Sequence, residues 1–113
     1  MDGKELVQRF FQALARGSME EAEGLFAEDA VLVGPGGERV RGRRAIARSF
    51  FEGAGRRFSD LDVREEGERV LATFHVVPTG TGWMGPLPLR AEFCVEGERI
   101  TFLDFAVGGL RRT

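Results

Sequence analysis

The segment between residues 25 and 46 constrains the fold of this chain more than any other part of its sequence. Its pattern predicts the end of a helix, a short strand over residues 30–33 and a second short strand over residues 38–41. The Gly-Pro-Gly-Gly sequence at residues 34–37 separates these strands, because glycine and proline interrupt regular structure and favour sharp turns. A new helix is expected to begin at Gly42. Strands enclosed by helices in this way indicate an α+β domain.

In the N-terminal part of the chain, apolar residues recur with the spacing of an α-helix. Residues 3–16 place their apolar side chains on one face, which predicts a first amphipathic helix. Gly17 is expected to end this helix, and Ser18 to begin a second one over about residues 19–27 as its N-cap. A third helix is predicted from Gly42 to about residue 54. The apolar face of the first helix consists of Leu6, Val7, Phe10, Phe11 and Leu14.

From Phe58 onward the pattern changes to an alternation of apolar and polar residues, which is typical of strands. A long strand is predicted over residues 70–77 and a glycine- and proline-rich loop over 78–88. The last two strands are predicted over residues 89–95 and 99–107. Helices followed by a strongly bent antiparallel sheet predict an α+β fold.

Length and charge exclude several classes of protein. A chain of 113 residues is expected to form one domain, residues 1–113. It carries 16 Lys and Arg residues against 18 Asp and Glu residues, a net charge of −2. Nucleic acid is not expected as a partner, because phosphate binding needs a basic surplus. A membrane is not expected either, because glycines and prolines interrupt the uncharged stretch over residues 70–89 and the N-terminus is charged.

Cys94 is the single cysteine, so no intrachain disulfide and no cysteine-based zinc site can form. A free cysteine is typical of a reducing compartment, and we expect a cytoplasmic protein. His75 is the single histidine, and no metal-ligand spacing is present, so neither a metal nor a cofactor is expected. One possible role for Cys94 is that of a catalytic nucleophile paired with His75. A buried free cysteine, however, more often behaves as a small hydrophobe.

Residues 29–31 (Asp-Ala-Val), followed by the Gly-x-x-Ala-Ile motif at residues 42–46, resemble in order and spacing the SnoaL-like branch of the nuclear transport factor 2-like superfamily. The resemblance implies a small cone-shaped α+β barrel with one apolar pocket. Three N-terminal helices would pack in the concave face of a strongly curved antiparallel or mixed sheet. The core of this single domain would span residues 4–107, with residues 108–113 as a tail.

Ketosteroid isomerases belong to the same superfamily, but their catalytic set is incomplete here. Those enzymes use an aspartate before a proline, a tyrosine on the first helix and a protonated aspartate in the sheet. The matching positions hold Gly34, Phe10 and Ala91, and the chain contains no tyrosine. Because these catalytic residues are missing, steroid-isomerase chemistry by that route is excluded.

The register of the last hairpin decides which side chains face the implied pocket. A two-residue turn at Glu96-Gly97 is expected, and cross-strand partners then share a face. A three-residue loop would reverse the assignment. The expected pairs are Phe93 with Ile100, Ala91 with Phe102, and Leu89 with Asp104. The more apolar face should point inward, and it consists of Leu89, Ala91, Phe93, Ile100, Phe102, Asp104 and Ala106.

This register places Asp104 in apolar surroundings, where an unpaired carboxylate is costly and its protonated form is favoured. Such a group suits a general acid or base. SnoaL-like cyclases and limonene-epoxide hydrolases carry an essential aspartate on the equivalent last strand, so the resemblance implies that Asp104 is catalytic. The alternative is a structural acid at the pocket rim, bonded to the backbone or to an arginine.

His75 is the second catalytic candidate, because histidine titrates near neutral pH. Two arguments about its orientation conflict. The alternation places the more apolar residues Val70, Ala72, Phe74 and Val76 on one face, which would turn His75 outward. Alignment of this strand with the steroid-isomerase pattern would turn His75 inward. Both orientations stay open at this point.

The remaining site residues are predicted to line the pocket with apolar side chains. Trp83 lies in the glycine-proline loop, where it would serve as a lid over a ligand or as an anchor for the loop or a partner subunit. The expected substrate-binding residues are Phe10, Leu14, Val33, Phe50, Trp83, Phe93 and Phe102.

The outer face of the sheet is expected to carry an apolar strip, formed by Leu103, Phe105 and Val107 with additions from Leu71 and Val77. Exposed strips of this kind often mark an interface between subunits. Members of the resembled family commonly associate through the sheet. A homodimer through the outer sheet face is therefore expected.

Three functions remain in competition. The first is an isomerase, hydratase or hydrolase that acts on a small apolar molecule with Asp104 as its single acid–base group. The second is a non-catalytic protein that binds such a molecule, and the third is a homodimerisation module without enzymatic activity. The incomplete catalytic set shifts weight from the first to the other two.

Overall fold

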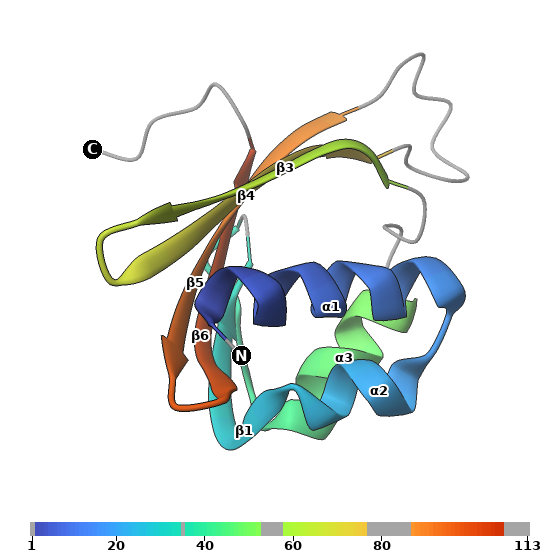
Figure 1. The fold of residues 1–113 in the computed structure, drawn as a ribbon. Helices are drawn as coiled ribbons and strands as arrows, with labels where there is room; N and C mark the ends of the chain where they lie inside the picture. Colours follow the sequence, from blue (N-terminus) through green and yellow to red (C-terminus); the bar gives the residue numbers. More distant parts are fainter. Residues whose placement is uncertain (1, 35, 53–57, 77–86, 108–113) are drawn as a thin grey trace.

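The computed structural model describes residues 2–34, 36–52, 58–76 and 87–107, with three helices and six strands in that part of the chain (Figure 1). The predicted tail over 108–113, Trp83 and Val77 lie outside the described residues. The helices are α1 (Gly3–Arg16), α2 (Met19–Gly24) and α3 (Arg43–Glu52). The strands are β1 (Phe26–Val33), β2 (Arg39–Arg41), β3 (Phe58–Glu66), β4 (Arg69–Val76), β5 (Leu87–Glu96) and β6 (Arg99–Val107).

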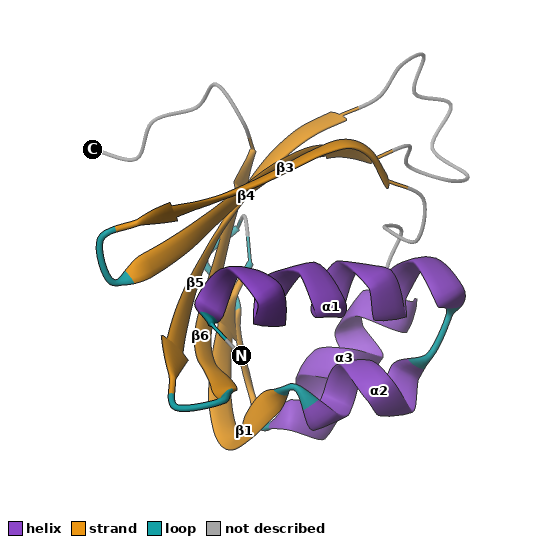
Figure 2. Cartoon of the chain, in the orientation of Figure 1, coloured by secondary structure: helices purple, strands orange, loops and turns teal. Residues whose placement is uncertain are grey.

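The strands form one sheet with the order β2-β1-β6-β5-β4-β3. Strands β1 and β6 run parallel, and the other neighbouring strands run antiparallel. The sheet is curved, and the helices lie on its inner side (Figure 2). We call this helix-covered side the concave face and the opposite side the convex face. The predicted α+β class, the mixed sheet and the placement of the helices are thus confirmed.

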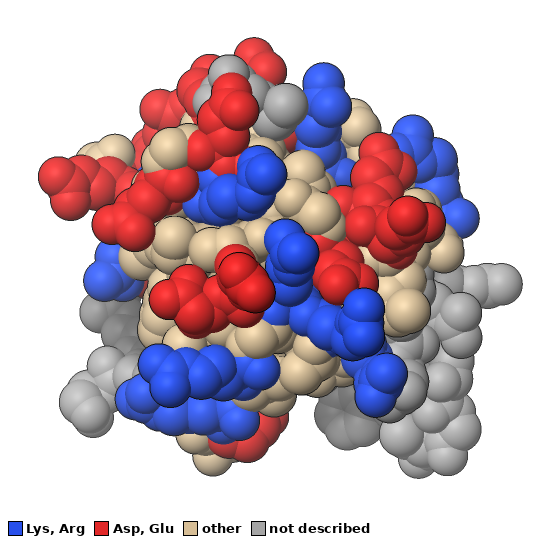
Figure 3. All heavy atoms as spheres, turned by 90° about the horizontal axis from the view of Figure 1, so that it is seen from below, with Lys and Arg blue, Asp and Glu red and all other residues tan. Residues whose placement is uncertain are grey.

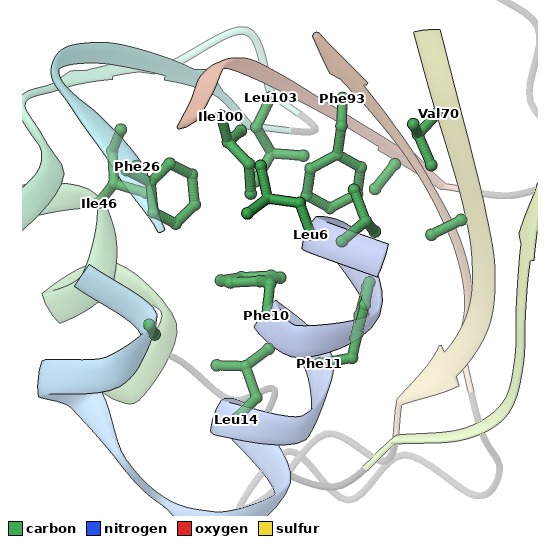
Figure 4. Close-up of a cluster of buried hydrophobic side chains, with 14 of the residues drawn as sticks. Leu6, Phe10, Phe11, Leu14, Phe26, Ile46, Val70, Phe93, Ile100 and Leu103 are labelled. Carbon is green, nitrogen blue, oxygen red and sulfur yellow. The ribbon is translucent and has the colours of Figure 1, made fainter. Parts of the chain in front are cut away.

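Helix α1 begins and ends where the sequence predicts. The Asp2 carboxylate accepts a hydrogen bond of 2.8 Å from the Glu5 backbone N–H and caps the first turn. Gly17 ends the helix in the left-handed conformation, with φ 73°. The apolar face of α1 is buried and packs onto the sheet, with Leu6 beside Phe93, Ile100 and Leu103 (Figure 4). The cap, the apolar spacing and the terminal glycine therefore suffice to predict this helix.

Helix α2 is shorter than predicted, because β1 begins at Phe26 rather than at residue 30. Phe26 pairs with Ile100 of β6, and the Leu25 carbonyl accepts a hydrogen bond of 2.9 Å from the Ile100 N–H. Phe26 is also fully buried. Pairing with a strand distant in sequence thus overrides the helical pattern at the end of α2.

The last hairpin differs from its predicted register. The turn lies at Gly97-Glu98, with Gly97 at φ 63°, so Glu96 pairs with Arg99. One step further into the hairpin, between the pairs Val95–Ile100 and Cys94–Phe102, β6 contains one extra residue, Thr101. Such a β-bulge exchanges the two faces of a strand beyond it.

The bulge makes the predicted faces of β6 wrong from Phe102 onward. Leu103 and Phe105 are buried on the concave face, where they pair with Phe93 and Ala91. Phe102, Asp104 and Ala106 alternate with them, so these three residues belong to the convex face. The physical reason is burial: without the bulge a carboxylate would enter the core, while Leu103 and Phe105 would face water.

The expected apolar strip on the outer face is corrected by the same observation. Leu103 and Phe105 do not contribute to it, and nothing is described for the side chain of Val107. Leu71 lies on the convex face, since it pairs with Glu92, but it is buried and does not form part of an exposed strip. The apolar side chains that alternate onto this face from β1 and β6 include Val31, Val33, Phe102 and Ala106, all half-buried.

Candidate functional site

The concave face holds a group of aromatic side chains that we call the phenylalanine cluster, formed by Phe11, Phe50, Phe58, Phe74 and Phe105. Ring centroids lie 5.1 Å apart for Phe11–Phe74 and for Phe50–Phe105, and 5.3 Å apart for Phe11–Phe58. Phe74 contacts Phe58 and Phe105 at 6.3 and 6.2 Å. These distances are typical of edge-to-face and tilted aromatic pairs. The cluster joins α1, α3, β3, β4 and β6.

The phenylalanine cluster is not sealed on all sides. Phe11, Phe74 and Phe105 are buried, but Phe50 and Phe58 are only half-buried. Phe10 lies behind the cluster with no exposed surface, and its ring contacts Phe50 at 5.0 Å. The half-buried rings therefore give a small apolar molecule a surface to contact that is backed by a packed core.

Within the described ranges, no buried side chain is polar or charged. The interior of the concave face therefore offers dispersion and aromatic contacts, and its described residues supply no acid, base or nucleophile. Such surroundings suit contacts with an apolar molecule.

The predicted pocket residues divide between the two faces. Phe10, Leu14 and Phe93 are buried on the concave face and form core rather than an open lining. Phe50 also lies on this face, at the phenylalanine cluster. The predicted places of Val33 and Phe102 in the pocket are wrong, because both residues belong to the convex face. Val33 pairs with Asp104, and Phe102 with Cys94.

Asp104 also lies on the convex face, so its predicted place in the apolar pocket is wrong. Its cross-strand partner is Glu92, which accepts a hydrogen bond of 2.8 Å from Arg69. That hydrogen bond raises the pKa of the Arg69 guanidinium, and the nearby groups of Cys94, Glu92 and Asp104 raise it further. Asp104 therefore belongs to a group of charges around Arg69.

His75 points outward, which settles the two conflicting orientations. Val70, Ala72, Phe74 and Val76 of β4 are buried on the concave face, and His75 alternates with them. The His75 Nδ1 lies 3.4 Å from the Asp60 Oδ2. Both residues line a hollow of about 430 Å³ on the convex side, together with Thr73 and Arg90.

Sequence reasoning missed most of the phenylalanine cluster and the partner of His75. The periodicity of α1 and β4 marks Phe11 and Phe74 as buried, and this signal could have placed them near Phe50. Phe105 was hidden by the bulge of β6. Asp60 lies in a second irregularity, in β3, which alternation cannot reveal.

The underside of the molecule as drawn in Figure 1 carries basic and acidic side chains side by side (Figure 3). A hollow of about 500 Å³ near the start of α3 is lined by Arg41, Arg43, Arg44 and Arg48, but also by Glu23 and Glu28. Arg44 and Glu23 approach to 3.7 Å. Basic and acidic side chains of the described residues are therefore intermixed on this side.

Two further properties concern the described residues alone. They contain no group of three or more His, Cys, Asp or Glu side chains that could hold a metal ion. None of their helices has the length and apolar character needed to cross a membrane.

The chain is similar to known proteins in sequence and in fold. The family model of the SnoaL-like domain matches residues 7–103. A solved protein structure from Sphaerobacter thermophilus is 25% identical over 99% of both chains, with a TM-score of 0.82. No curated protein matches the chain.

Two of the similar structures are named as polyketide cyclases. A "putative polyketide cyclase" from Pseudomonas putida is 27% identical, with 96% of this chain and 93% of that chain covered and a TM-score of 0.79. Another, from Xanthomonas campestris, is 28% identical, with 92% and 88% covered and a TM-score of 0.75.

Proposed function

This chain belongs to the SnoaL-like domain family, and from this membership and the phenylalanine cluster we propose that it binds a small apolar molecule on its concave face. The observation that carries this function is the half-buried state of Phe50 and Phe58. A planar ligand can extend the edge-to-face packing of these rings and exclude water from them. The side chains behind them are already packed, so the cost of ordering the site is small.

The ligand class that we propose is an aromatic or polycyclic ketone. Two similar structures are named as polyketide cyclases, and the cyclised form of a polyketide is a ring system that bears oxygen atoms. A flat ring system matches the aromatic surfaces that the cluster offers. The function that we propose is binding of such a compound and not its conversion, because the described side chains buried on the concave face include no acid or base.

The test is a titration with prodan, a neutral naphthyl ketone whose fluorescence reports apolar surroundings. We expect the wild-type protein to bind it and Phe50→Ala to bind about tenfold more weakly, since an aromatic contact is lost. Phe102→Ala is the matched control, because it removes a half-buried phenylalanine from the opposite face. Equal affinities for Phe50→Ala and the wild type would contradict the proposed site.

Thermal unfolding of both variants belongs to the same experiment. Phe50 also contacts Phe10 and Phe105, so its truncation weakens the core as well as the ligand surface. Phe50→Leu keeps most of the packing volume but removes the ring. Weak binding by a stable Phe50→Leu protein would assign the loss to the aromatic contact.

A second proposal concerns the convex face, through which we propose a homodimer. Half-buried Val31, Val33 and Phe102 alternate onto this face, and no described helix covers it. Arg69, Glu92 and Arg90 add a row of alternating charges: Glu92 lies 2.8 Å from Arg69 and 3.5 Å from Arg90. Such a row can pair with its own copy across a twofold axis.

Sedimentation equilibrium tests this assembly. We expect the wild-type protein to have twice the mass of the 12.5 kDa chain and Phe102→Arg to sediment as a monomer. Met19→Arg is the control, because Met19 is an exposed apolar residue on α2, away from the sheet. A wild-type monomer at micromolar concentration would end this proposal without affecting the ligand site.

A further inference from the structure

The Glu38 side chain folds back over the glycine turn that joins β1 to β2. The Gly34 N–H donates a hydrogen bond of 2.8 Å to the Glu38 carbonyl, and the Gly37 N–H donates one of 2.9 Å to the Gly34 carbonyl. A Cβ atom at Gly34 would overlap Oε1 of Glu38 and lie 2.5 Å from its Cδ, and a Cβ atom at Gly36 would lie 2.7 Å from Oε2. The carboxylate therefore occupies space that exists only because both positions are glycine.

This carboxylate belongs to the concave side of the sheet. Leu32 of β1 pairs with Leu103, which is buried on the concave face, and side chains alternate along a strand, so Gly34 follows Leu32 on that face. Glu38 is the cross-strand neighbour of Gly34, and such neighbours share a face. Val40 comes two positions after Glu38, and it packs against the hydrophobic core as this assignment requires.

The same register brings Gly34 to the border of the phenylalanine cluster. Strands β1 and β6 run parallel, and Val33 pairs with Asp104. One step further along both strands, Gly34 comes level with Phe105, at the usual strand spacing of about 5 Å. Phe105 is a member of the phenylalanine cluster. Because Gly34 has no side chain, the Glu38 carboxylate that covers it lies next to the cluster.

The Glu38 carboxylate is available to a ligand. Its side chain is exposed, and within the described part of the chain its carboxylate takes part in no hydrogen bond or ion pair. A carboxylate accepts hydrogen bonds and donates none. A hydrogen bond to a charged oxygen is shorter than one between neutral groups and about twice as strong. A carboxylate beside aromatic rings therefore suits a flat molecule that carries a hydroxyl group at its edge.

We infer that Glu38 is a specificity-determining residue of the proposed ligand site, where it accepts a hydrogen bond from a hydroxyl group on the ring system of the ligand. The inference rests on the proposed function and narrows its ligand class to aromatic compounds that bear a phenolic hydroxyl group. An ether at the same position has no hydrogen to donate. An anionic group is repelled by the carboxylate. The preferred ligands are therefore neutral phenols.

Isothermal titration calorimetry with a matched set of naphthalenes tests this preference. Naphthol and the corresponding methoxynaphthalene share a ring system, but only naphthol has a hydroxyl hydrogen. At about pH 7, where a phenol is neutral, we expect the wild-type protein to bind naphthol about tenfold more tightly, since a hydrogen bond to a charged group is worth about that factor at an exposed site. The corresponding naphthoate carries a negative charge and should bind most weakly.

Variants of Glu38 and of the glycine beneath it identify the acceptor. Glu38→Ala should bind naphthol and methoxynaphthalene equally, and Glu38→Gln, which keeps a neutral acceptor, should prefer naphthol by only about threefold. Gly34 is not among the residues with positive φ, so Gly34→Ala fits the backbone, but its Cβ atom displaces the carboxylate. We expect Gly34→Ala to lose most of the preference for naphthol.

Glu96→Gln is the matched control, because it removes the same charge at an exposed site elsewhere. Glu96 lies in the β5–β6 hairpin, near the start of β6, whereas Gly34 comes level with the end of that strand. The control should retain the full preference for naphthol.

Equal wild-type affinities for naphthol and methoxynaphthalene, or a preference that Glu38→Ala retains, would overturn the inference. A full preference in Gly34→Ala would also overturn it, because the carboxylate would then act from a place other than the space over Gly34. Failure of the proposed function has a different signature, in which Phe50→Ala binds neither compound more weakly than the wild type does. Where the inference alone fails, Phe50→Ala weakens the binding of both compounds and Glu38→Ala changes neither.

Discussion

The Thr101 hydroxyl donates a hydrogen bond of 3.2 Å to the Cys94 carbonyl, at the point where β6 contains one residue more than β5. This contact lies inside the bulge and satisfies a carbonyl where the strand pairing is irregular. The face on which each later side chain of β6 lies depends on this extra residue. Leu103 reaches the core and Asp104 the convex face because Thr101 is accommodated outside the regular pairing.

Replacement of Thr101 by valine keeps the shape of the side chain but removes this hydrogen bond. We expect Thr101→Val to lower the free energy of unfolding by about 1 kcal/mol, the usual worth of one such bond. Urea denaturation followed by circular dichroism measures the change. Thr73→Val, at a half-buried threonine of the convex face, is the control and should lose less than half as much. Equal losses in the two variants would show that the Thr101 hydroxyl has no special role in the bulge.

The turn of the same hairpin makes a second prediction. Gly97 has φ 63°, a conformation that alanine adopts only at a cost, so Gly97→Ala should lower the free energy of unfolding by about 1 kcal/mol. Gly24 ends α2 with open space around it, and Gly24→Ala should be neutral or stabilising. The midpoint in urea should therefore fall for Gly97→Ala and stay the same or rise for Gly24→Ala. A Gly97→Ala protein as stable as the wild type would contradict the turn position.

Elements determined by neighbouring residues were predictable from the sequence, whereas elements determined by residues distant in the chain were not. Helix α1 was predictable because its cap, its apolar spacing and its terminal glycine all lie within residues 2–17. The mixed sheet and the concave helical layer followed from the family resemblance, which the match over residues 7–103 supports. The early start of β1 was not predictable, because Phe26 is recruited by Ile100, more than seventy positions away in the chain.

The candidate site was harder to predict for a related reason. A bulge shifts every later side chain of its strand to the opposite face of the sheet. The alternation of apolar and polar residues in the sequence does not show where a bulge lies. The misplacement of Phe102 and Asp104 comes from the bulge at Thr101, and the missed contact of Asp60 with His75 comes from the bulge in β3. The outward orientation of His75, in contrast, follows from regular alternation in β4, which was one of the two predicted outcomes.

A third prediction concerns the core behind the proposed ligand site. Phe10 has no exposed surface, and its ring lies within 6 Å of those of Phe11, Phe26, Phe50 and Phe93. We expect Phe10→Ala to cost about 3–5 kcal/mol, because it leaves a cavity among packed rings. Phe102→Ala should cost markedly less, since Phe102 is half-buried. Thermal and urea unfolding check the ranking, and similar losses would contradict the assignment of the two faces of the sheet.

The last prediction separates Asp104 from the ligand site. Because Asp104 lies on the convex face with Glu92, Asp104→Asn should bind prodan with wild-type affinity. A carboxyl at the proposed ligand site would behave differently, since its neutralisation would remove a buried charge and strengthen the binding of an apolar molecule. Loss of this carboxylate should instead affect its surroundings on the convex face, where Asp104 contributes to the raised pKa of Arg69. The homodimer proposed above provides the second readout: Asp104→Asn should change the dimer dissociation constant and leave the prodan titration unchanged. A stronger binding of prodan by Asp104→Asn would return this side chain to the concave face and contradict the observed register of β6.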